Sequence, residues 1–315
     1  GLLVIKYRVT TPDGKMLGGP MYALEKGLGW KWMAILFAIF TACASFGIGS
    51  TVQANAIATM TRETYGISTS IMGIIISVLV TAVVCGGVKS IAKVCGLLVP
   101  LMAVLYVLGC IYILYVNNEY VWPAIKQIIT AAFSPQATGG GLVGSTLMTA
   151  ARYGISRGLF SNESGLGSAP IVAAAAQTRN PVRQALVSST GTFWDTVVIC
   201  AITGVVIVSS ILHYPEITYN NGATLTKVAF EKIPYVGTPI LNFGLITFAF
   251  STILGWCYYG ERAVEYLKGK KWMIGYRIVF IITLYLGSIA NLNEVWTISD
   301  CTNALMAIPN LLSLL

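Results

Sequence analysis

Long runs of residues without a charged side chain are the feature that most limits what this chain can fold into. The first run extends from Trp32 to Thr61, thirty residues, before Arg62 interrupts it. About 20 predominantly apolar residues are enough for a helix to cross the hydrocarbon core of a bilayer. The run is therefore long enough to span a membrane as a tilted or bent helix, with lipid around it.

Composition indicates a membrane protein with several such helices. Hydrophobic residues make up 56% of the 315 residues and charged residues only 10%, whereas soluble domains carry about 25% charged residues. The short alternating segments of an outer-membrane barrel are absent from the sequence. We predict an all-α polytopic fold with eight spans, at about residues 32–61, 70–88, 95–116, 141–177, 186–212, 236–259, 272–289 and 294–315.

The basic residues predict how these spans are oriented. If residues 1–31 are cytoplasmic, fourteen of the twenty Lys and Arg residues fall on the cytoplasmic side and four on the other. Cytoplasmic loops carry such an excess. We therefore expect 1–31 to be a cytoplasmic amphipathic segment and 32–315 to be a transmembrane core in the cell membrane. The net charge of +8 has the same origin, so it does not indicate binding to nucleic acid.

The segment Arg157–Gln177 interrupts the apolar pattern in the second half of the chain. Its first part is rich in glycine and polar side chains, and a helix with Pro170 in its first turn is expected from Ala169 to Gln177. Irregular polar backbone at membrane depth is tolerated only where it lines a cavity or is buried in protein. A helix broken near 157–167 would offer free backbone groups to a carboxylate or a cation. The alternative is a cytoplasmic loop between two ordinary spans.

Four further polar residues lie within the predicted spans. Gln53 and Asn55 lie in the glycine-rich middle of the first run, where they would line a cavity or hold a neighbouring helix by hydrogen bonds. Asp195 lies about ten residues, or ~15 Å, into its run, and an ionisable group at that depth is a functional candidate. It would be neutral, paired with an arginine or part of cation coupling. Asp300 lies nearer to a span end, within reach of water.

Four stretches of the chain resemble the alanine or glycine:cation symporter family. They are GGPMY (18–22), FGIGSTVQANAIA (46–58), FSNESGLGSAPIVAAAAQTRNPVRQALV (160–187) and FSTILGWCYYGERAVEYL (250–267). That family is similar in fold to the five-plus-five inverted-repeat transporters of the amino-acid/polyamine/organocation type. The resemblance implies that this chain is a fragment holding about core helices three to ten, with the broken element as helix six.

The resemblance also implies a site for a small neutral amino acid, alanine or glycine. Backbone near the break would hold the substrate, and the ring of Phe160 would close the pocket. Thr252 and Trp256 are four residues apart and share one helix face, so Trp256 would form a second wall. The alternative for Trp256 is a place in the aromatic belt at the membrane surface. The expected substrate-binding residues are Gln53, Phe160, Asn162, Gly165, Thr252 and Trp256.

Sodium is the coupling ion that the resemblance implies. Ser251 and Thr252 resemble the pair of adjacent hydroxyls that binds sodium in this fold, and hydroxyl oxygens suit a hard cation. Alternatively, both hydroxyls bond to the preceding turn of their own helix. Glu163 is expected first to support the break, through the helix dipole or a pair with Arg157, and only second to bind the ion.

Sodium-coupled symport of a small neutral amino acid is the function that these features predict. A proton-coupled carrier and a passive channel are the alternatives, although a channel needs a continuous polar stripe and the polar residues here cluster at breaks. The one histidine, His213, lies next to Tyr214 and Pro215 at a predicted span end, where no serine or cysteine can be matched with it for nucleophilic catalysis. The sequence also holds no GxxxxGK[ST] motif, the signature of a Walker-type phosphate-binding loop. We expect no enzyme activity and no cofactor beside the coupling ion.

Overall fold

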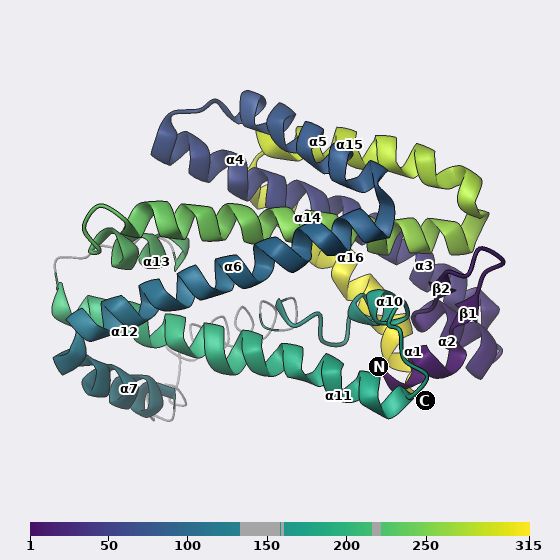
Figure 1. The fold of residues 1–315 in the computed structure, drawn as a ribbon, viewed down its shortest axis with the longest axis horizontal. Helices are drawn as coiled ribbons and strands as arrows, with labels where there is room; N and C mark the ends of the chain where they lie inside the picture. The colour runs from purple at the N-terminus through teal and green to yellow at the C-terminus, as the bar shows by residue number, and fades with distance from the viewer. Residues whose placement is uncertain (133–157, 159–160, 216–221) are drawn as a thin grey trace, which may run out of the picture. The chain divides into compact units, whose positions relative to one another are not determined.

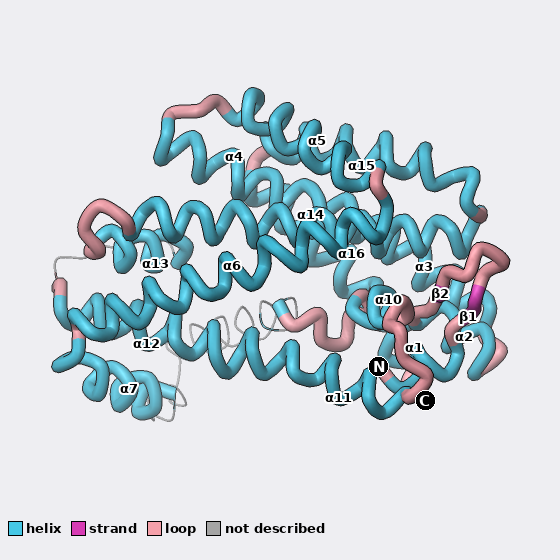
Figure 2. The backbone as a smooth tube through the Cα atoms, viewed as in Figure 1, coloured by secondary structure: helices cyan, strands magenta, loops and turns pink. Residues whose placement is uncertain are grey.

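The computed structural model describes residues 1–132, 158, 161–215 and 222–315 of the chain. These residues are mostly helical, as the apolar runs predict, and one short hairpin supplies the strands found among them (Figure 2). The chain forms two compact units. Unit 1 comprises residues 1–100, 165–189 and 245–315, and unit 2 comprises residues 101–164 and 190–244.

A helix, a hairpin and a second helix form the N-terminal part of unit 1. Thr11 and Lys15 close the hairpin by a backbone hydrogen bond of 2.8 Å, in agreement with the turn-forming sequence TPDGK. Asp13 at the hairpin tip accepts a hydrogen bond from Lys270, and this bond together with the lysine charge lowers the pKa of the exposed carboxyl group. The elements are α1 (Leu2–Tyr7), β1 (Val9–Thr10), β2 (Met16–Leu17) and α2 (Pro20–Gly27).

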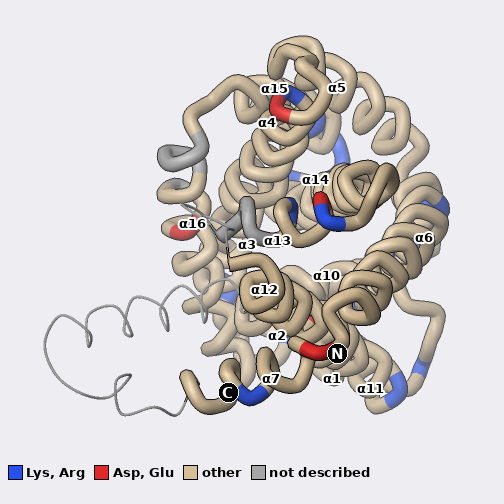
Figure 3. Tube along the Cα trace, turned by 90° about the vertical axis from the view of Figure 1, so that its left-hand side faces the viewer, with Lys and Arg blue, Asp and Glu red and all other residues tan. Residues whose placement is uncertain are grey.

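Five helical segments within the described residues are long and apolar enough to cross a membrane. They are Lys31–Tyr65, Gly87–Val116, Pro181–His213, Gly237–Lys268 and Lys270–Ile289. A sixth apolar helix, α5 (Thr69–Cys85), has 17 residues. Few charged residues lie along these helices (Figure 3). Of the eight predicted spans, the broken one falls largely outside the described residues, and the last corresponds to α16 (Leu292–Leu312).

Two of the long segments contain a π-helical stretch. The first consists of α3 (Lys31–Phe46), the π-helix η1 (Gly47–Thr51) and α4 (Val52–Tyr65), and the second of α11 (Pro181–Thr192), the π-helix η2 (Phe193–Cys200) and α12 (Ala201–His213). π-helical stretches widen a helix locally and recur at functional sites.

The other long segments are α6 (Gly87–Val116), α14 (Gly237–Lys268) and η3 (Lys270–Trp272) with α15 (Met273–Ile289). The shorter helices are α7 (Asn118–Ala132), α10 (Ala169–Ala173) and α13 (Gly222–Glu231).

Two helices extend into segments that the sequence analysis assigned to loops. α6 begins at Gly87, so Lys89 and Lys93 lie in its first turns. α14 continues beyond the predicted end at residue 259 to Lys268 and includes Arg262. In both cases the hydrophobic run ends before the helix does, because backbone hydrogen bonding continues once charged side chains have water or partners of opposite charge.

The helix after the break is shorter than predicted. α10 ends at Ala173 rather than at Gln177. The guanidinium group of Arg8 explains this end, because it donates hydrogen bonds to the carbonyl oxygens of Ala174 (3.2 Å), Ala176 (2.9 Å) and Thr178 (2.5 Å). These carbonyls therefore have a partner outside the helix, a contact over more than 160 residues that local propensity does not encode.

In unit 1, α15 packs against α4, α5 and η1, and α16 packs against α3 and η1. Figure 1 shows α5 and α15 side by side. The side-chain amide of Asn55 on α4 donates to the carbonyl oxygens of Gly287 (3.0 Å) and Ala290 (2.8 Å). Carbonyls at a helix C-terminus lack intrahelical partners, so Asn55 ties the end of α15 to α4.

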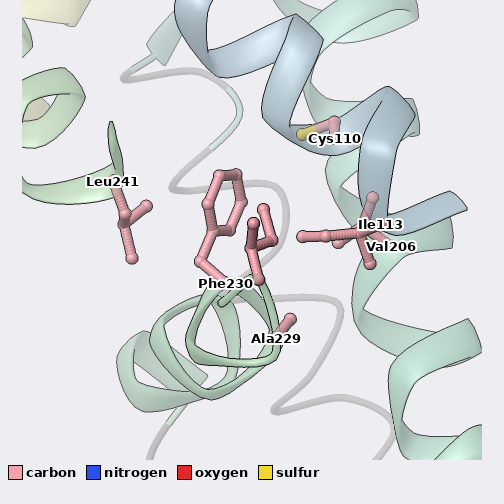
Figure 4. Close-up of a cluster of buried hydrophobic side chains, with 7 residues drawn as sticks. Cys110, Ile113, Val206, Ala229, Phe230 and Leu241 are labelled. Atoms are coloured by element: carbon pink, nitrogen blue, oxygen red, sulfur yellow. The ribbon is translucent and has the colours of Figure 1, made fainter. Parts of the chain in front are cut away.

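Unit 2 has its own hydrophobic core. Phe230 is fully buried in a cluster of seven side chains (Figure 4). The Tyr106 ring stacks on Phe230 at 5.4 Å, and its hydroxyl group bonds to Thr203 at 2.7 Å. The cluster consists of Cys110, Ile113, Val206, Ala229, Phe230, Ile233 and Leu241.

Candidate functional site

The π-helix η1 and the predicted pocket wall Trp256 lie in direct contact. Trp256 on α14 is 1% exposed. A Cβ atom added to Gly49 of η1 would lie 2.1 Å from the Cβ of Trp256, so only a glycine fits opposite this side chain. Tyr259 packs edge-on against the indole at 5.5 Å. Trp256 is thus buried against η1, and its role as a pocket wall stays a prediction.

The two polar residues of the first span have different environments. Gln53 is buried, and its amide nitrogen donates to the carbonyl oxygen of Ile48 in η1 at 3.4 Å. This bond leaves Gln53 beside the π-helical stretch. Asn55 forms the two bonds to the end of α15 described above, so its amide holds a neighbouring helix, which is one of the two roles that the sequence left open.

The two hydroxyl groups of the predicted sodium site bond to the same carbonyl oxygen. Ser251 and Thr252 both donate to Phe248, each at 2.9 Å. This is the intrahelical bond that the sequence analysis gave as the alternative. It uses the hydrogen of each hydroxyl group and leaves oxygen lone pairs for a cation. The geometry is therefore compatible with sodium ligation by these two oxygens.

The end of the break, residues 166–168, is buried in protein, whereas Ser161 at its start is exposed. Residues 162–167 form turns, and the left-handed φ values of Gly165 (76°) and Gly167 (85°) prevent a continuous helix. Leu166 is 6% exposed and Ser168 is fully buried. The choice between a broken helix and a loop between two spans stays a prediction for this segment. Buried irregular backbone of this kind must find its hydrogen-bond partners within the protein.

Residues at the start of the break bond to the π-helix η2 in unit 2. The hydroxyl group of Ser161 donates to both carboxylate oxygens of Asp195, at 2.9 and 2.7 Å. The amide of Asn162 donates to the hydroxyl oxygen of Thr196 at 2.8 Å. Asp195 lies near the middle of the Pro181–His213 segment. The structure therefore brings two predicted site residues, Asn162 and Asp195, to one polar cluster.

The other residues named in the sequence analysis are Glu163, Asp300, Phe160 and Arg157. Glu163 has a left-handed φ of 51° in the turn before α10 and is not in the first turn of that helix, so the helix-dipole argument for it was wrong. Asp300 lies on α16 next to Ser299, whose side chain approaches Gly47 of η1. Phe160 and Arg157 lie outside the described residues.

A buried ion cluster was not singled out in the sequence analysis. Glu261 is 2% exposed and receives hydrogen bonds from Arg277 on α15 and from Arg262. Arg262 also pairs with Glu265 and lies 5.1 Å from the centre of the Tyr258 ring. The charged residues in GERAVE, directly after an apolar run, were the available signal. The cluster holds two acids and two bases, which neutralise one another at the end of α14.

Five long apolar helical segments, two of them with a π-helical stretch, indicate a multi-pass membrane protein. Secondary transporters of this class form their sites at interrupted helices. The sodium:alanine symporter family model matches residues 1–315. The chain belongs to this family, which is a family of transporters and not of enzymes, and its function is sodium-coupled symport of an amino acid.

Individual relatives support the same assignment. An uncharacterized transporter of Haemophilus influenzae is 49% identical over all of this chain and 69% of its own length. The sodium/alanine symporter AgcS of Methanococcus maripaludis is 47% identical over all of this chain and 70% of its own length. The probable sodium/glutamine symporter GlnT of Bacillus subtilis is 34% identical over 98% of this chain and 63% of its own length.

Proposed function

We propose that the protein carries alanine, with glycine as a second substrate, together with sodium across the cell membrane into the cytoplasm. The family and the 47% identity to a sodium/alanine symporter support alanine, whereas the glutamine symporter is the more distant relative at 34%. In this proposal 32–315 supplies about helices three to ten of a five-plus-five inverted-repeat core, and 1–31 is cytoplasmic because of the basic-residue asymmetry.

The irregular stretch before α10, which is buried at residues 166–168, is the observation that carries this proposal. Carbonyl and N–H groups of a discontinuous helix suit the carboxylate and ammonium groups of an amino acid and a sodium ion. Asn162 and Gly165 lie in the break, and Phe160, which we also propose for the pocket, lies outside the described residues. Trp256, Thr252 and Gln53 are the further substrate-binding residues that we propose from the family resemblance. A wall formed by the indole of Trp256 would favour a substrate with a small side chain.

Sodium has two candidate sets of oxygen ligands. The first is the Ser251 and Thr252 pair, whose oxygens keep free lone pairs. The second is the polar cluster of unit 2, where the carboxylate of Asp195 adds a negative charge that a cation would neutralise. The buried Oδ1 of Asn162 has no hydrogen-bond partner among the described residues, which supports a role for this cluster. We assign Asp195 a part in coupling and Glu163 and Asp300 supporting roles.

Uptake by the purified protein in liposomes tests the proposal. An inward sodium gradient is expected to drive accumulation of labelled alanine, and replacement of sodium by potassium on both sides is expected to abolish it. Liposomes preloaded with unlabelled alanine should show counterflow, since a carrier exchanges substrate across the membrane. Accumulation driven by a proton gradient without sodium would contradict the coupling ion, and lack of counterflow would contradict a carrier in favour of a channel.

A further inference from the structure

The carbonyl oxygen of Gly165 has a specific partner outside the break. The side chain of Asn310, near the end of α16, is 7% exposed, and its Nδ2 donates a hydrogen bond of 2.9 Å to this oxygen. The two residues are 145 positions apart. Because the break lacks the regular helical pattern, its buried carbonyls depend on such side-chain donors.

The same asparagine also fixes the backbone two residues further on. A Cβ atom added to Gly167 would lie 2.6 Å from the Oδ1 of Asn310 and 2.8 Å from the Cγ of Pro20 on α2. Gly167 has a left-handed φ of 85°, a conformation that glycine adopts without strain. Asn310 and Pro20 therefore both pack closely against Gly167, while the side-chain amide of Asn310 donates its hydrogen bond to the carbonyl oxygen of Gly165.

From these contacts we infer that Asn310 is a positioning residue for transport, because its side-chain amide sets the backbone geometry of the substrate-binding break. This inference rests on the proposed function, in which the break binds alanine. The donor occupies the Gly165 carbonyl, so the neighbouring backbone groups are oriented before substrate arrives. A preorganised site binds more tightly because less ordering accompanies binding. Loss of the donor is expected to weaken alanine binding more than it slows transport at saturation.

Three variants separate this role from ordinary helix packing. Asn310→Leu keeps the approximate size of the side chain but has no donor. Asn310→Asp keeps its shape, and the new carboxyl group can donate to Gly165 only when it is protonated. Ser313→Ala is the matched control, because the Ser313 hydroxyl donates to the backbone carbonyl of Asn310 at 2.6 Å. The control perturbs the same turn of α16 and leaves the hydrogen bond from the Asn310 side chain to the Gly165 carbonyl oxygen intact.

The experiment measures sodium-driven alanine uptake in liposomes at about pH 5.5 and about pH 8, so that the new carboxyl group is compared under acidic and basic conditions. We expect the KM for alanine of Asn310→Leu to rise about tenfold at both values, as for the loss of a buried hydrogen bond. Asn310→Asp should show the rise at the higher pH and approach the wild-type KM at the lower one. The Ser313→Ala variant should keep the wild-type KM, while thermal unfolding in detergent reports whether each variant is folded.

The outcomes distinguish this inference from the proposed function. Folded Asn310 variants that keep the wild-type KM at both pH values would overturn the positioning role alone. If Asn310→Leu does not fold, the pH response of Asn310→Asp decides, and a KM that does not fall at low pH would overturn the role. A wild-type protein that takes up no alanine with sodium would overturn both.

Discussion

Trp256 of α14 and Gly49 of η1 lie so close that a Cβ atom on the glycine would stand 2.1 Å from the Cβ of the tryptophan. The contact joins the π-helical stretch of the first span to the helix that carries the predicted sodium ligands. Both residues lie in segments that resemble family motifs. The close approach explains why small residues are required at this point of the GIGST sequence.

Gly49→Ala is therefore expected to destabilise the protein. The new methyl group would collide with the Cβ and Cγ atoms of Trp256, so the backbone of η1 or of α14 would have to shift. Overpacking of this kind costs about 1–3 kcal/mol or more. Gly255→Ala is the matched control, since a Cβ at this neighbouring position of α14 meets nothing within 4 Å. Thermal unfolding in detergent should show a lower Tm for Gly49→Ala alone. Equal Tm values would show that the two segments separate easily.

The apolar runs predicted the helices of unit 1 and unit 2 well, because hydrophobic length alone indicates a span. Their ends were harder to predict. α10 stops early because of Arg8, and α14 continues because Glu261 and Arg277 form ion pairs across two helices. These contacts join residues far apart in sequence, so neither hydropathy nor local propensity contains them. The bonds of Asn55 to α15 and of Asn310 to Gly165 were unpredictable for the same reason.

The buried ion cluster makes a second prediction. Arg277→Met leaves the carboxylate of Glu261 buried with a weaker partner, Arg262 at 3.4 Å. Removing one member of a buried ion pair lowers the free energy of unfolding by about 3–5 kcal/mol. We expect about 3 kcal/mol here, because the Arg277 side chain is 27% exposed. The double variant Glu261→Gln/Arg277→Met should regain part of the lost stability, as thermal unfolding would show.

Lys271→Met is the control for this pair, because Lys271 is an exposed basic residue that precedes α15. It should change the Tm little, since surface charges contribute about 0–1 kcal/mol. If the single and double variants at Glu261 and Arg277 are equally unstable, the cluster does not act as a unit.

The orientation makes a third prediction. Cysteine substitutions at Lys89 and Lys270 are expected to react with a membrane-impermeant reagent only from the cytoplasmic side, and a substitution at the exposed Asn118 only from outside. The reason is the asymmetry of fourteen basic residues against four. The substitutions are made in a variant from which the seven native cysteines have been removed. The extent of labelling is then measured on intact cells and on inverted vesicles. A reversed pattern would show that residues 1–31 are outside.

The hydroxyl pair makes a fourth prediction. Thr252→Ala should raise the sodium concentration for half-maximal alanine uptake, by the loss of one ligand worth about 1–3 kcal/mol, and Ser251→Ala should do so less. Thr41→Ala is the matched control, because Thr41 donates to the carbonyl oxygen four residues earlier, Phe37, at 2.8 Å, as Thr252 does to Phe248. If all three variants keep the wild-type sodium dependence, the hydroxyl groups only bond within their helices.

The last prediction concerns the size of the substrate. One methyl group gives a pocket only about 1–3 kcal/mol of discrimination, so a site for alanine must exclude larger amino acids by steric clash. The buried indole of Trp256 suits that role, and the ring of Phe160 is the second predicted wall. Trp256→Ala and Phe160→Ala are therefore expected to admit valine or leucine, with weaker binding of alanine.

Competition of labelled alanine uptake by a series from glycine to leucine measures the size limit. Trp122→Ala serves as the control, because that side chain is 73% exposed and lies outside the predicted pocket. Loss of a buried tryptophan also costs about 3–5 kcal/mol, so Trp256→Phe provides a milder step that should enlarge the pocket partially. Folded Trp256 variants that reject valine as strongly as the wild type would show that the indole supports α14 and η1 without lining the substrate site.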